Sequence, residues 1–257
     1  MAKVLVTGAN GTVGRFVVAE LIAAEHRVRA LLHHNKASIP PGVEIVEGDI
    51  SSDQDLVSAV KGVDAVIHCA TNPSRHRHVD LKGTQKLVTA IHGEGRVHLI
   101  YPSMVGAELI PRSYMATKVA VEQLIEHARL PWSIFRFTEV NERVWRELQH
   151  AARWPTMFVA ARTRIQVLDA KVAAFRLVDL VRIGASGRVP DLGGPFAYKT
   201  KDLARSYLAA SGRRRLVIPF NSFGLAGAAL RAGANLTRNR AHGTKDWNDF
   251  VARFASR

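Results

Sequence analysis

The stretch from Lys3 to Gly14, K-V-L-V-T-G-A-N-G-T-V-G, constrains this chain more than any other. It begins with the run Val4 to Val6, whose apolar and β-branched residues indicate a buried strand. Glycines break the run, and from Thr12 onward apolar residues return at helical spacing. A strand, a tight turn and a helix in this order leave free helix N–H groups at the turn, where a pyrophosphate is the usual occupant. We therefore expect a nucleotide site here, with an ordinary strand-to-helix turn as the alternative.

The glycines have separate uses in such a turn. Gly8 and Gly11 permit sharp backbone angles and the approach of a phosphate with no Cβ between, while Gly14 lets the helix pack closely on the strand. The spacing is G-x-x-G-x-x-G rather than the G-x-G-x-x-G of many dinucleotide sites. The residues expected to hold the dinucleotide at this turn are Gly8, Asn10, Gly11, Thr12, Val13 and Gly14.

Strand and helix patterns alternate after the turn. Strands are expected at 28–32, 43–46, 65–70, 97–101 and 132–137, and the helices among them at 52–61, 79–92 and 114–127. This rhythm predicts a Rossmann-type α/β fold, a doubly wound parallel sheet with helices on both faces. Beyond residue 140 the expected elements are helices at 141–153 and 171–182, helices capped by Thr200 and Thr244, extended pieces at 157–160 and 164–168, and a turn-rich piece at 184–195.

The length of 257 residues is ordinary for one α/β domain. We expect a single domain over 1–257, in which 1–140 form the dinucleotide-binding core. The segment 141–257 is expected to supply mainly the substrate pocket and the C-terminal elements, because ligands of such sheets bind outside the carboxyl ends of the strands.

Composition narrows the class of protein. One cysteine, Cys69, excludes an internal disulfide and is typical of a reducing compartment. Neither a secretory signal nor a membrane-spanning apolar stretch is visible, so we expect a cytoplasmic protein with no membrane partner. The net charge of +14 fits nucleic-acid binding, but the basic residues are scattered and no aromatic platform accompanies Arg213 to Arg215. Attraction for an anionic cofactor is the favoured interpretation.

A second feature, S-Y-M-A-T-K, places Tyr114 and Lys118 at i and i+4, on one face of a helix. A phenol ionises with a pKa of about 10, but an ammonium group one turn away favours the phenolate. A tyrosine tuned in this way can pass a proton to or from an alcohol or carbonyl oxygen. Ser103, at the end of the preceding strand, could hydrogen-bond the same oxygen. The alternative is an unrelated surface pair.

These stretches resemble the short-chain dehydrogenase/reductase superfamily, in particular its atypical, NmrA-like branch. The first turn of that branch commonly reads T-G-A-x-G-x-x-G, which Thr7 to Gly14 matches. The likeness continues at Gly48-Asp49, His68 to Ala70, Lys118 to Glu122, Leu130 to Trp132, Arg136 and 187–195. The resemblance implies that Ser103 steadies the substrate oxygen and Tyr114 is the acid/base. It also implies that Lys118 serves both Tyr114 and the nicotinamide ribose.

The same resemblance implies further contacts with the dinucleotide, of the adenine with Asp49 and Ile50 and of the middle portion with Ala70, Thr71 and Asn72. Two departures fall where substrate walls are expected. Phe137 stands where relatives often have proline, and Lys171 stands where an acidic residue is usual. The substrate therefore cannot be inherited from the family, whose branch also contains members that sense the dinucleotide without turnover.

The cofactor is predicted to be NADP(H) rather than NAD(H). An NAD-binding unit places an Asp or Glu about 20 residues past the glycine turn to hold the ribose hydroxyls. The segment from Leu32 to Lys36 has no carboxylate at that point. Lys36 can meet a 2′-phosphate directly and His33 or His34 can meet it by hydrogen bonds, with Arg15 as a further candidate. A solvated basic loop is the alternative.

Other groups are weaker candidates. Arg75 to His78 offers a histidine pair but no completing carboxylate or cysteine, so we predict a solvated loop over the cofactor and no metal. Cys69 lies in an apolar strand and is interpreted as core rather than nucleophile. Trp145, Trp154 and Phe158 line an apolar pocket in one interpretation and pack in the core in the other.

The first functional hypothesis is an NADP(H)-dependent oxidoreductase that transfers a hydride between the nicotinamide and a small carbonyl, quinone or similar substrate. The second is a non-catalytic NADP(H)-sensing regulator that presents a surface to a partner protein. The set Ser103, Tyr114 and Lys118 favours the first, because a sensor needs no tuned phenol. We expect a small-molecule substrate, no nucleic-acid partner, and a monomer or small homo-oligomer.

Overall fold

The computed structural model describes residues 1–33, 39–241 and 245–255. The chain forms two compact units, each made of three segments. Unit 1 consists of Met1–Ser103, Ser113–Arg136 and Ala173–Pro190, and unit 2 of Met104–Arg112, Phe137–Val172 and Asp191–Arg257.

Unit 1 is built on a seven-stranded sheet with the strand order β10-β6-β5-β4-β1-β2-β3. The strands are β1 (Lys3–Thr7), β2 (Arg27–Leu32), β3 (Glu44–Glu47), β4 (Ala65–His68), β5 (His98–Met104), β6 (Trp132–Phe137) and β10 (Gly187–Leu192). The pairings that run from β3 through β2, β1 and β4 to β5 are parallel. The order changes direction at β1, between β2 and β4, and a doubly wound sheet places its ligand at such a switch point.

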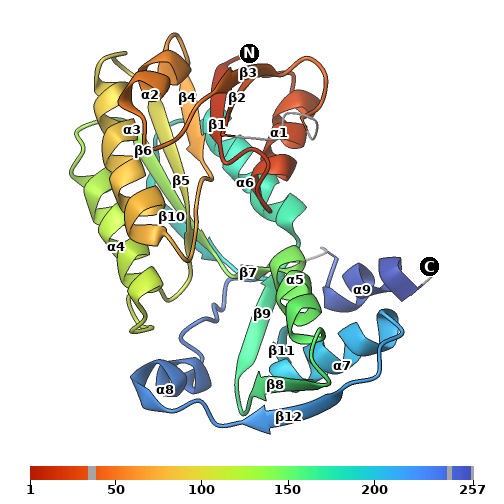
Figure 1. The fold of residues 1–257 in the computed structure, drawn as a ribbon. Coiled ribbons are helices and arrows are strands. Elements are labelled where there is room, and N and C mark those ends of the chain that lie inside the picture. The colour runs from red at the N-terminus through yellow and green to blue at the C-terminus, as the bar shows by residue number, and fades with distance from the viewer. Residues whose placement is uncertain (34–38, 242–244, 256–257) are drawn as a thin grey trace. The chain divides into compact units, whose positions relative to one another are not determined.

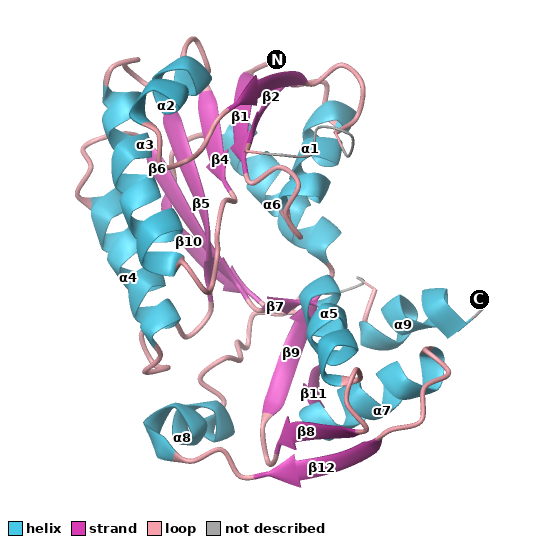
Figure 2. Ribbon diagram, in the orientation of Figure 1, coloured by secondary structure: helices cyan, strands magenta, loops and turns pink. Residues whose placement is uncertain are grey.

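Helices cover both faces of this sheet (Figure 1). One face carries α2 (Asp53–Val60), α3 (Gly83–His92) and α4 (Ser113–Glu126), and the other carries α1 (Gly14–Ala23) and α6 (Ala170–Ile183) (Figure 2). Leu5, Leu56, Leu87, Leu99 and Val121 are fully buried between the sheet and the first group of helices. Burying a side chain of this size stabilises the fold by about 1.5–3 kcal/mol. The predicted Rossmann-type fold is confirmed.

Local predictions in unit 1 were met in part. Ser52 caps α2, because its hydroxyl accepts a hydrogen bond from Asp55 N at 3.4 Å. The helix predicted at 79–92 is α3 preceded by a π-helical turn, η2 (Arg77–Lys82). The turn-rich interpretation of 184–195 was wrong, since this stretch contains β10. Pro190 obscured the strand, yet proline is tolerated on the edge of a sheet, where β10 lies.

Unit 2 contains two small sheets and four described helices. The strands are β7 (Glu139–Val140), β8 (Thr156–Ala160), β9 (Arg164–Leu168), β11 (Ala197–Lys199) and β12 (Leu216–Phe220), in the orders β11-β9-β7 and β12-β8. The helices are α5 (Asn141–Ala151), α7 (Thr200–Ala210), α8 (Gly224–Ala232) and α9 (Trp247–Ala255). Thr200 is not the predicted cap of α7, because Lys199 holds that position and the Thr200 hydroxyl donates to Ala160 O. Thr244 lies outside the described residues.

The aromatic residues of unit 2 separate into core and surface. Trp145 packs on Tyr207 and Phe254, with ring centroids 4.6 and 4.1 Å apart. Trp154 and Phe158 are 71% and 63% exposed. Only Trp145 of the three therefore packs against a core. No helix in the described parts of the chain is long and apolar enough to cross a membrane.

Candidate active site

The glycine turn joins β1 to α1 and is shaped by its own backbone contacts. Gly8 has a φ of 65°, in the left-handed region, and a Cβ on it would collide with the backbone of Cys69 and Ala70. A Cβ on Gly14 would collide with Gly8 O, while Gly11 N donates to that same oxygen at 2.8 Å. The first turn of α1 contains no acidic residue, and Val13 provides no side-chain cap. The start of α1 thus suits an anion such as a pyrophosphate.

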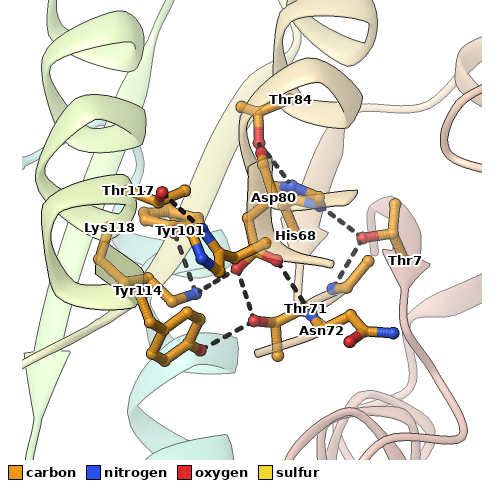
Figure 3. A network of polar contacts seen from close by, with 12 residues as sticks. Thr7, His68, Thr71, Asn72, Asp80, Thr84, Tyr101, Tyr114, Thr117 and Lys118 are labelled. Atoms are coloured by element: carbon orange, nitrogen blue, oxygen red, sulfur yellow. Dashed lines mark hydrogen bonds and ion pairs between the residues drawn. The ribbon is translucent and has the colours of Figure 1, made fainter. Parts of the chain in front are cut away.

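A buried carboxylate, Asp80, organises the polar network at the end of β4 (Figure 3). Asp80 lies in η2 and is 1% exposed. Its Oδ1 meets Lys118 Nζ at 3.1 Å and Thr71 Oγ1 at 2.6 Å, and its Oδ2 accepts from Asn72 N at 2.9 Å. A buried carboxylate is tolerated only when it is paired and hydrogen-bonded in this way. Asp80 therefore ties the segment after β4 to helix α4.

Lys118 is the cation of this network. It is 4% exposed, and its Nζ donates to Tyr101 OH at 3.1 Å and lies 5.4 Å from the Tyr114 ring centroid. Burial would lower the pKa of Lys118, but the neighbouring Tyr101, Tyr114 and Asp80 side chains raise it above its ordinary value. Burial raises the pKa of Tyr101 to about 12, so that phenol is protonated at neutral pH.

Tyr114 stands at the accessible end of the same network. Its hydroxyl lies 2.9 Å from Thr71 Oγ1, and Thr71 is exposed while Tyr114 is half-buried. The ring of His76 meets the ring of Tyr114 edge-on at 5.9 Å, and His76 Nδ1 lies 2.8 Å from Thr117 Oγ1. The structure thus brings Tyr114 and Lys118 together with Thr71 and Asn72, four residues that the sequence singled out.

Ser103 lies at the end of β5. It is 1% exposed, and among the described residues its hydroxyl has no hydrogen-bond partner. Burial would raise the pKa of Glu122, but the hydrogen bonds from Arg136 bring it below its ordinary value. The role of Ser103 at a substrate oxygen stays a prediction.

The residues expected at the adenine end lie beyond β2 and β3. His33 Nε2 is 3.2 Å from Asp49 Oδ2, and hydrogen bonds from Ser51 hold the pKa of Asp49 below its ordinary value. Ile50 is 8% exposed and its side chain belongs to the core. Ala70 N donates to Thr7 Oγ1 at 3.3 Å. His34 and Lys36 lie outside the described residues.

Asp80 and His68 were missed as network residues. His68 Nδ1 is 2.6 Å from Thr7 Oγ1 and His68 Nε2 is 2.9 Å from Thr84 Oγ1. Burial, with a smaller effect of Lys118, lowers the pKa of His68 to about 4, so its imidazole is neutral. One signal for Asp80 was present in the sequence: Asp80, Thr84 and Leu87 follow helical spacing, which puts an acid on the buried stripe of a predicted helix.

Thiol and metal chemistry have little support here. Burial raises the pKa of Cys69 to about 12, which leaves no thiolate to act as a nucleophile at neutral pH. In the described parts of the chain, no three His, Cys, Asp or Glu side chains are grouped to hold a metal ion.

The chain belongs to the NAD(P)H-binding family, whose sequence profile matches residues 8–177. This membership confirms the NAD(P)-binding family that the first turn suggested. An uncharacterized protein of Mycobacterium bovis is 30% identical over 134 residues, which cover 52% of this chain and 14% of that protein. The chain thus covers 14% of the length of each of its three mycobacterial relatives.

A relative with wider coverage is the photosystem II assembly factor Ycf39 of Cyanophora paradoxa, 26% identical over 84% of this chain and 70% of that protein. Two solved structures share the fold. The UDP-glucose 4-epimerase of Thermus thermophilus, in complex with NAD, has a TM-score of 0.76 at 17% identity and covers 99% of this chain and 98% of its own. The NADPH-dependent quinone oxidoreductase of Escherichia coli, complexed with NADPH, has a TM-score of 0.74 at 16% identity over 98% and 94%.

Proposed function

We propose that this protein is an NADP(H)-dependent oxidoreductase that transfers a hydride between the nicotinamide and a small carbonyl, quinone or similar substrate. The observation that carries the proposal is the accessible Tyr114 hydroxyl, linked through Thr71 to the buried pair of Asp80 and Lys118. A site that only binds a dinucleotide gains nothing from a phenol connected to a lysine. Membership of the NAD(P)H-binding family supports the cofactor class.

The residues of this chain have distinct tasks in that reaction. A bound dinucleotide would supply or accept the hydride. Backbone N–H groups at the glycine turn and the start of α1 would hold its pyrophosphate. Lys118 would hold the nicotinamide ribose and stay charged, and Tyr114 would exchange a proton with the substrate oxygen. Ser103 would steady that oxygen.

We propose NADP(H) as the preferred cofactor because no carboxylate follows β2 in the described residues up to His33. His33, which follows β2 directly, lies 3.2 Å from Asp49 and would meet a 2′-phosphate by hydrogen bonds. The two solved neighbours bind NAD in one case and NADPH in the other, so the preference rests on the residues after β2.

The test is the consumption of NADPH by the wild-type protein with a panel of small aldehydes, ketones and quinones, followed by absorbance. We expect turnover with at least one compound class and slower turnover with NADH. Lys118→Met is the matched control, checked for folding by circular dichroism, and it should lose the activity. Tight NADPH binding without turnover of any compound would contradict the proposal that the protein is an enzyme.

The second candidate is a non-catalytic protein that binds NADP(H) and acts through a protein partner. It is favoured by one finding, the similarity to an assembly factor over most of the chain. The two candidates differ in what Tyr114 does. In the second, replacement of Tyr114 by phenylalanine would change neither cofactor binding nor partner binding.

A further inference from the structure

We propose that the outer face of the two-stranded sheet of β8 and β12, continued by the start of α8, is a surface that binds an anionic lipid membrane. This surface lies in unit 2 alone, and its role does not depend on the proposed catalysis. Two features indicate it: the alternation of buried and exposed side chains along the two strands, and the sign of the charges around them.

The inner face of this sheet is packed. β8 and β12 lie side by side in parallel (Figure 2), and successive side chains of a strand point to opposite faces. Met157 and Val159 of β8 are buried, and Val217 of β12 packs against the same cluster. That cluster includes Tyr207 and Leu208 of α7. Helix α7 therefore covers the inner face.

The outer face carries large apolar side chains that are exposed. Phe158 of β8 is 63% exposed, and Ile218, which pairs with it in the register, is 36% exposed. Leu216 and Phe220 lie two residues to either side of Ile218, on the same face, and are 62% and 45% exposed. Exposed apolar side chains are ordinary when they are scattered singly, but a contiguous group is typical of a binding surface.

The apolar surface continues along the chain beyond the two strands. Phe223, directly before α8, is 92% exposed, and Leu225 in the first turn of α8 is 78% exposed. Trp154, two residues before β8, is exposed as well. Together these side chains form the apolar patch, which consists of Trp154, Phe158, Leu216, Ile218, Phe220, Phe223 and Leu225.

The charges around the apolar patch have one sign. The segments 148–168 and 203–245 include both strands and α8, and they contain basic residues but no aspartate or glutamate. Arg213 to Arg215 lead directly into β12, Arg153 precedes β8 and Arg162 follows it. Arg213 and Arg215 donate hydrogen bonds to Ala152 O, a carbonyl oxygen without net charge. These bonds leave the positive charge in place, so the rim of the patch attracts anions.

Apolar side chains with a rim of arginines match the surface of an anionic membrane. Its lipid headgroups present the phosphates that arginine binds by charge-assisted hydrogen bonds, and the acyl chains lie directly beneath them. Apolar groups of peripheral proteins enter this boundary to a depth of about 5–10 Å. The expectation of no membrane partner rested on the lack of long apolar runs. Peripheral binding needs none, because exposed and buried residues alternate along short strands.

Three other occupants match this surface less well. A second copy of the chain would bring up a face of the same positive charge, which repels. A protein partner presents charges of both signs, and Pro219 removes a backbone N–H from β12 that an added strand would use. Single-stranded nucleic acid stacks on aromatic rings, but the aliphatic Ile218 occupies the middle of β12.

Co-sedimentation of the full chain with lipid vesicles tests the surface. We expect binding to vesicles of equal parts phosphatidylcholine and phosphatidylglycerol. Binding to phosphatidylcholine alone should be at least about tenfold weaker, because only the anionic lipid attracts the arginines. Added salt should weaken binding to the mixed vesicles, since it screens this attraction.

Three variants of exposed residues examine the apolar patch and its rim. Phe158→Ser and Phe223→Ser should each weaken binding to the mixed vesicles about tenfold, because each removes a ring that lipid would bury. Arg214→Glu should weaken binding to the mixed vesicles and leave the weak binding to phosphatidylcholine unchanged. Circular dichroism checks that each variant is folded.

Two matched variants elsewhere on the chain serve as controls. Phe175→Ser removes a phenylalanine of α6 that is 56% exposed, and Arg96→Glu reverses an exposed charge between α3 and β5. Both should bind the mixed vesicles as the wild type does.

Wild-type protein that does not sediment with the mixed vesicles would overturn the membrane role. Unchanged binding in Phe158→Ser and Phe223→Ser, or equal weakening by Arg96→Glu and Arg214→Glu, would also overturn it, because the net charge of +14 would then explain the attraction. A dimer in analytical ultracentrifugation, or binding of oligothymidylate, that is lost in Phe158→Ser while vesicles do not bind would assign the face to a second copy or to nucleic acid instead.

Discussion

Helix α4 carries two buried ionic clusters one turn apart, and they differ in what lies at their ends. In the first, Lys118 pairs with Asp80 and the chain of hydrogen bonds continues to the hydroxyls of Thr71 and Tyr114. In the second, Glu122 receives two hydrogen bonds from Arg136, at 2.9 and 2.6 Å, and one ion pair from Arg188 at 2.9 Å.

Burial of charge alone therefore does not mark a functional site. Asp80 and Glu122 are both almost fully buried and both paired with cations. The Glu122 cluster contains only guanidinium groups, which do not release protons at physiological pH, and the carboxylates Glu122 and Glu126, so it holds α4 to β6 and β10. The Asp80 cluster ends on an accessible phenol that can give up a proton.

The largest effect that follows from this contrast concerns Tyr114. Tyr114→Phe should lower turnover roughly 10²- to 10⁴-fold, the usual contribution of a general acid, and leave NADPH affinity nearly unchanged. Steady-state kinetics and calorimetry would measure the two quantities. Unaltered turnover on a confirmed substrate would remove Tyr114 from the mechanism and revive the sensing function.

A substitution in the second cluster should lower the stability of the protein. Glu122→Gln leaves Arg136 without its buried counter-charge, while Arg188 keeps Glu126, and should lower the free energy of unfolding by about 3 kcal/mol, as seen when one partner of a buried pair is removed. Urea unfolding would measure the loss. Asp53→Asn, which breaks the exposed pair with Lys86, is the control and should cost less than about 1 kcal/mol. Similar losses in both variants would contradict the structural role given to Glu122.

The Asp80 cluster also gives unfolding a dependence on acid through His68. The pKa of His68 is lowered from 6.5 to about 4 by burial, so only the unfolded chain takes up this proton between those values. The contribution of neutral His68 to the free energy of unfolding is fully present above pH 6.5. Below pH 6.5 it decreases by up to roughly 1.4 kcal/mol per pH unit, and the loss reaches about 2 kcal/mol at pH 5. His68→Gln should remove this part of the slope, while buried His98, whose pKa is also about 4, keeps its own part. An identical slope in His68→Gln would show that His68 is charged or exposed.

The smallest expected effect is the choice of cofactor. NADPH should bind at least about tenfold more tightly than NADH, a difference of roughly 1.4 kcal/mol, and should lose more affinity as salt rises. Calorimetric titration of both cofactors at two salt concentrations would measure this. Equal affinities, or tighter binding of NADH, would refute the preference for NADP(H).

Much of unit 1 could be predicted because its information is local. The glycine turn, the strands at 28–32 and 132–137 and the pair of Tyr114 and Lys118 depend on spacing within a few residues. The edge strand β10 was missed because a proline masked it. Its place depends on pairing within the sheet, which no local pattern records.

The site could be predicted only in part for the same reason. Spacing identified Lys118 as a cation near Tyr114, but the offset of its charge by Asp80 depends on a contact between η2 and α4 that are far apart in sequence. Ser103 was singled out by its position at the end of a strand, and the structure buries its hydroxyl with no hydrogen-bond partner among the described residues. The role of a buried carboxylate depends on the groups that it contacts, and the hydrophobic periodicity of a sequence does not identify those groups.

A crystal structure with NADPH bound tests the central claim most directly. The account predicts the pyrophosphate at the first turn of α1, the ribose in hydrogen-bond distance of Lys118 Nζ, and the nicotinamide C4 facing a space bordered by the Tyr114 hydroxyl. A nicotinamide that lies away from Tyr114, or a Lys118 that contacts no part of the cofactor, would contradict it.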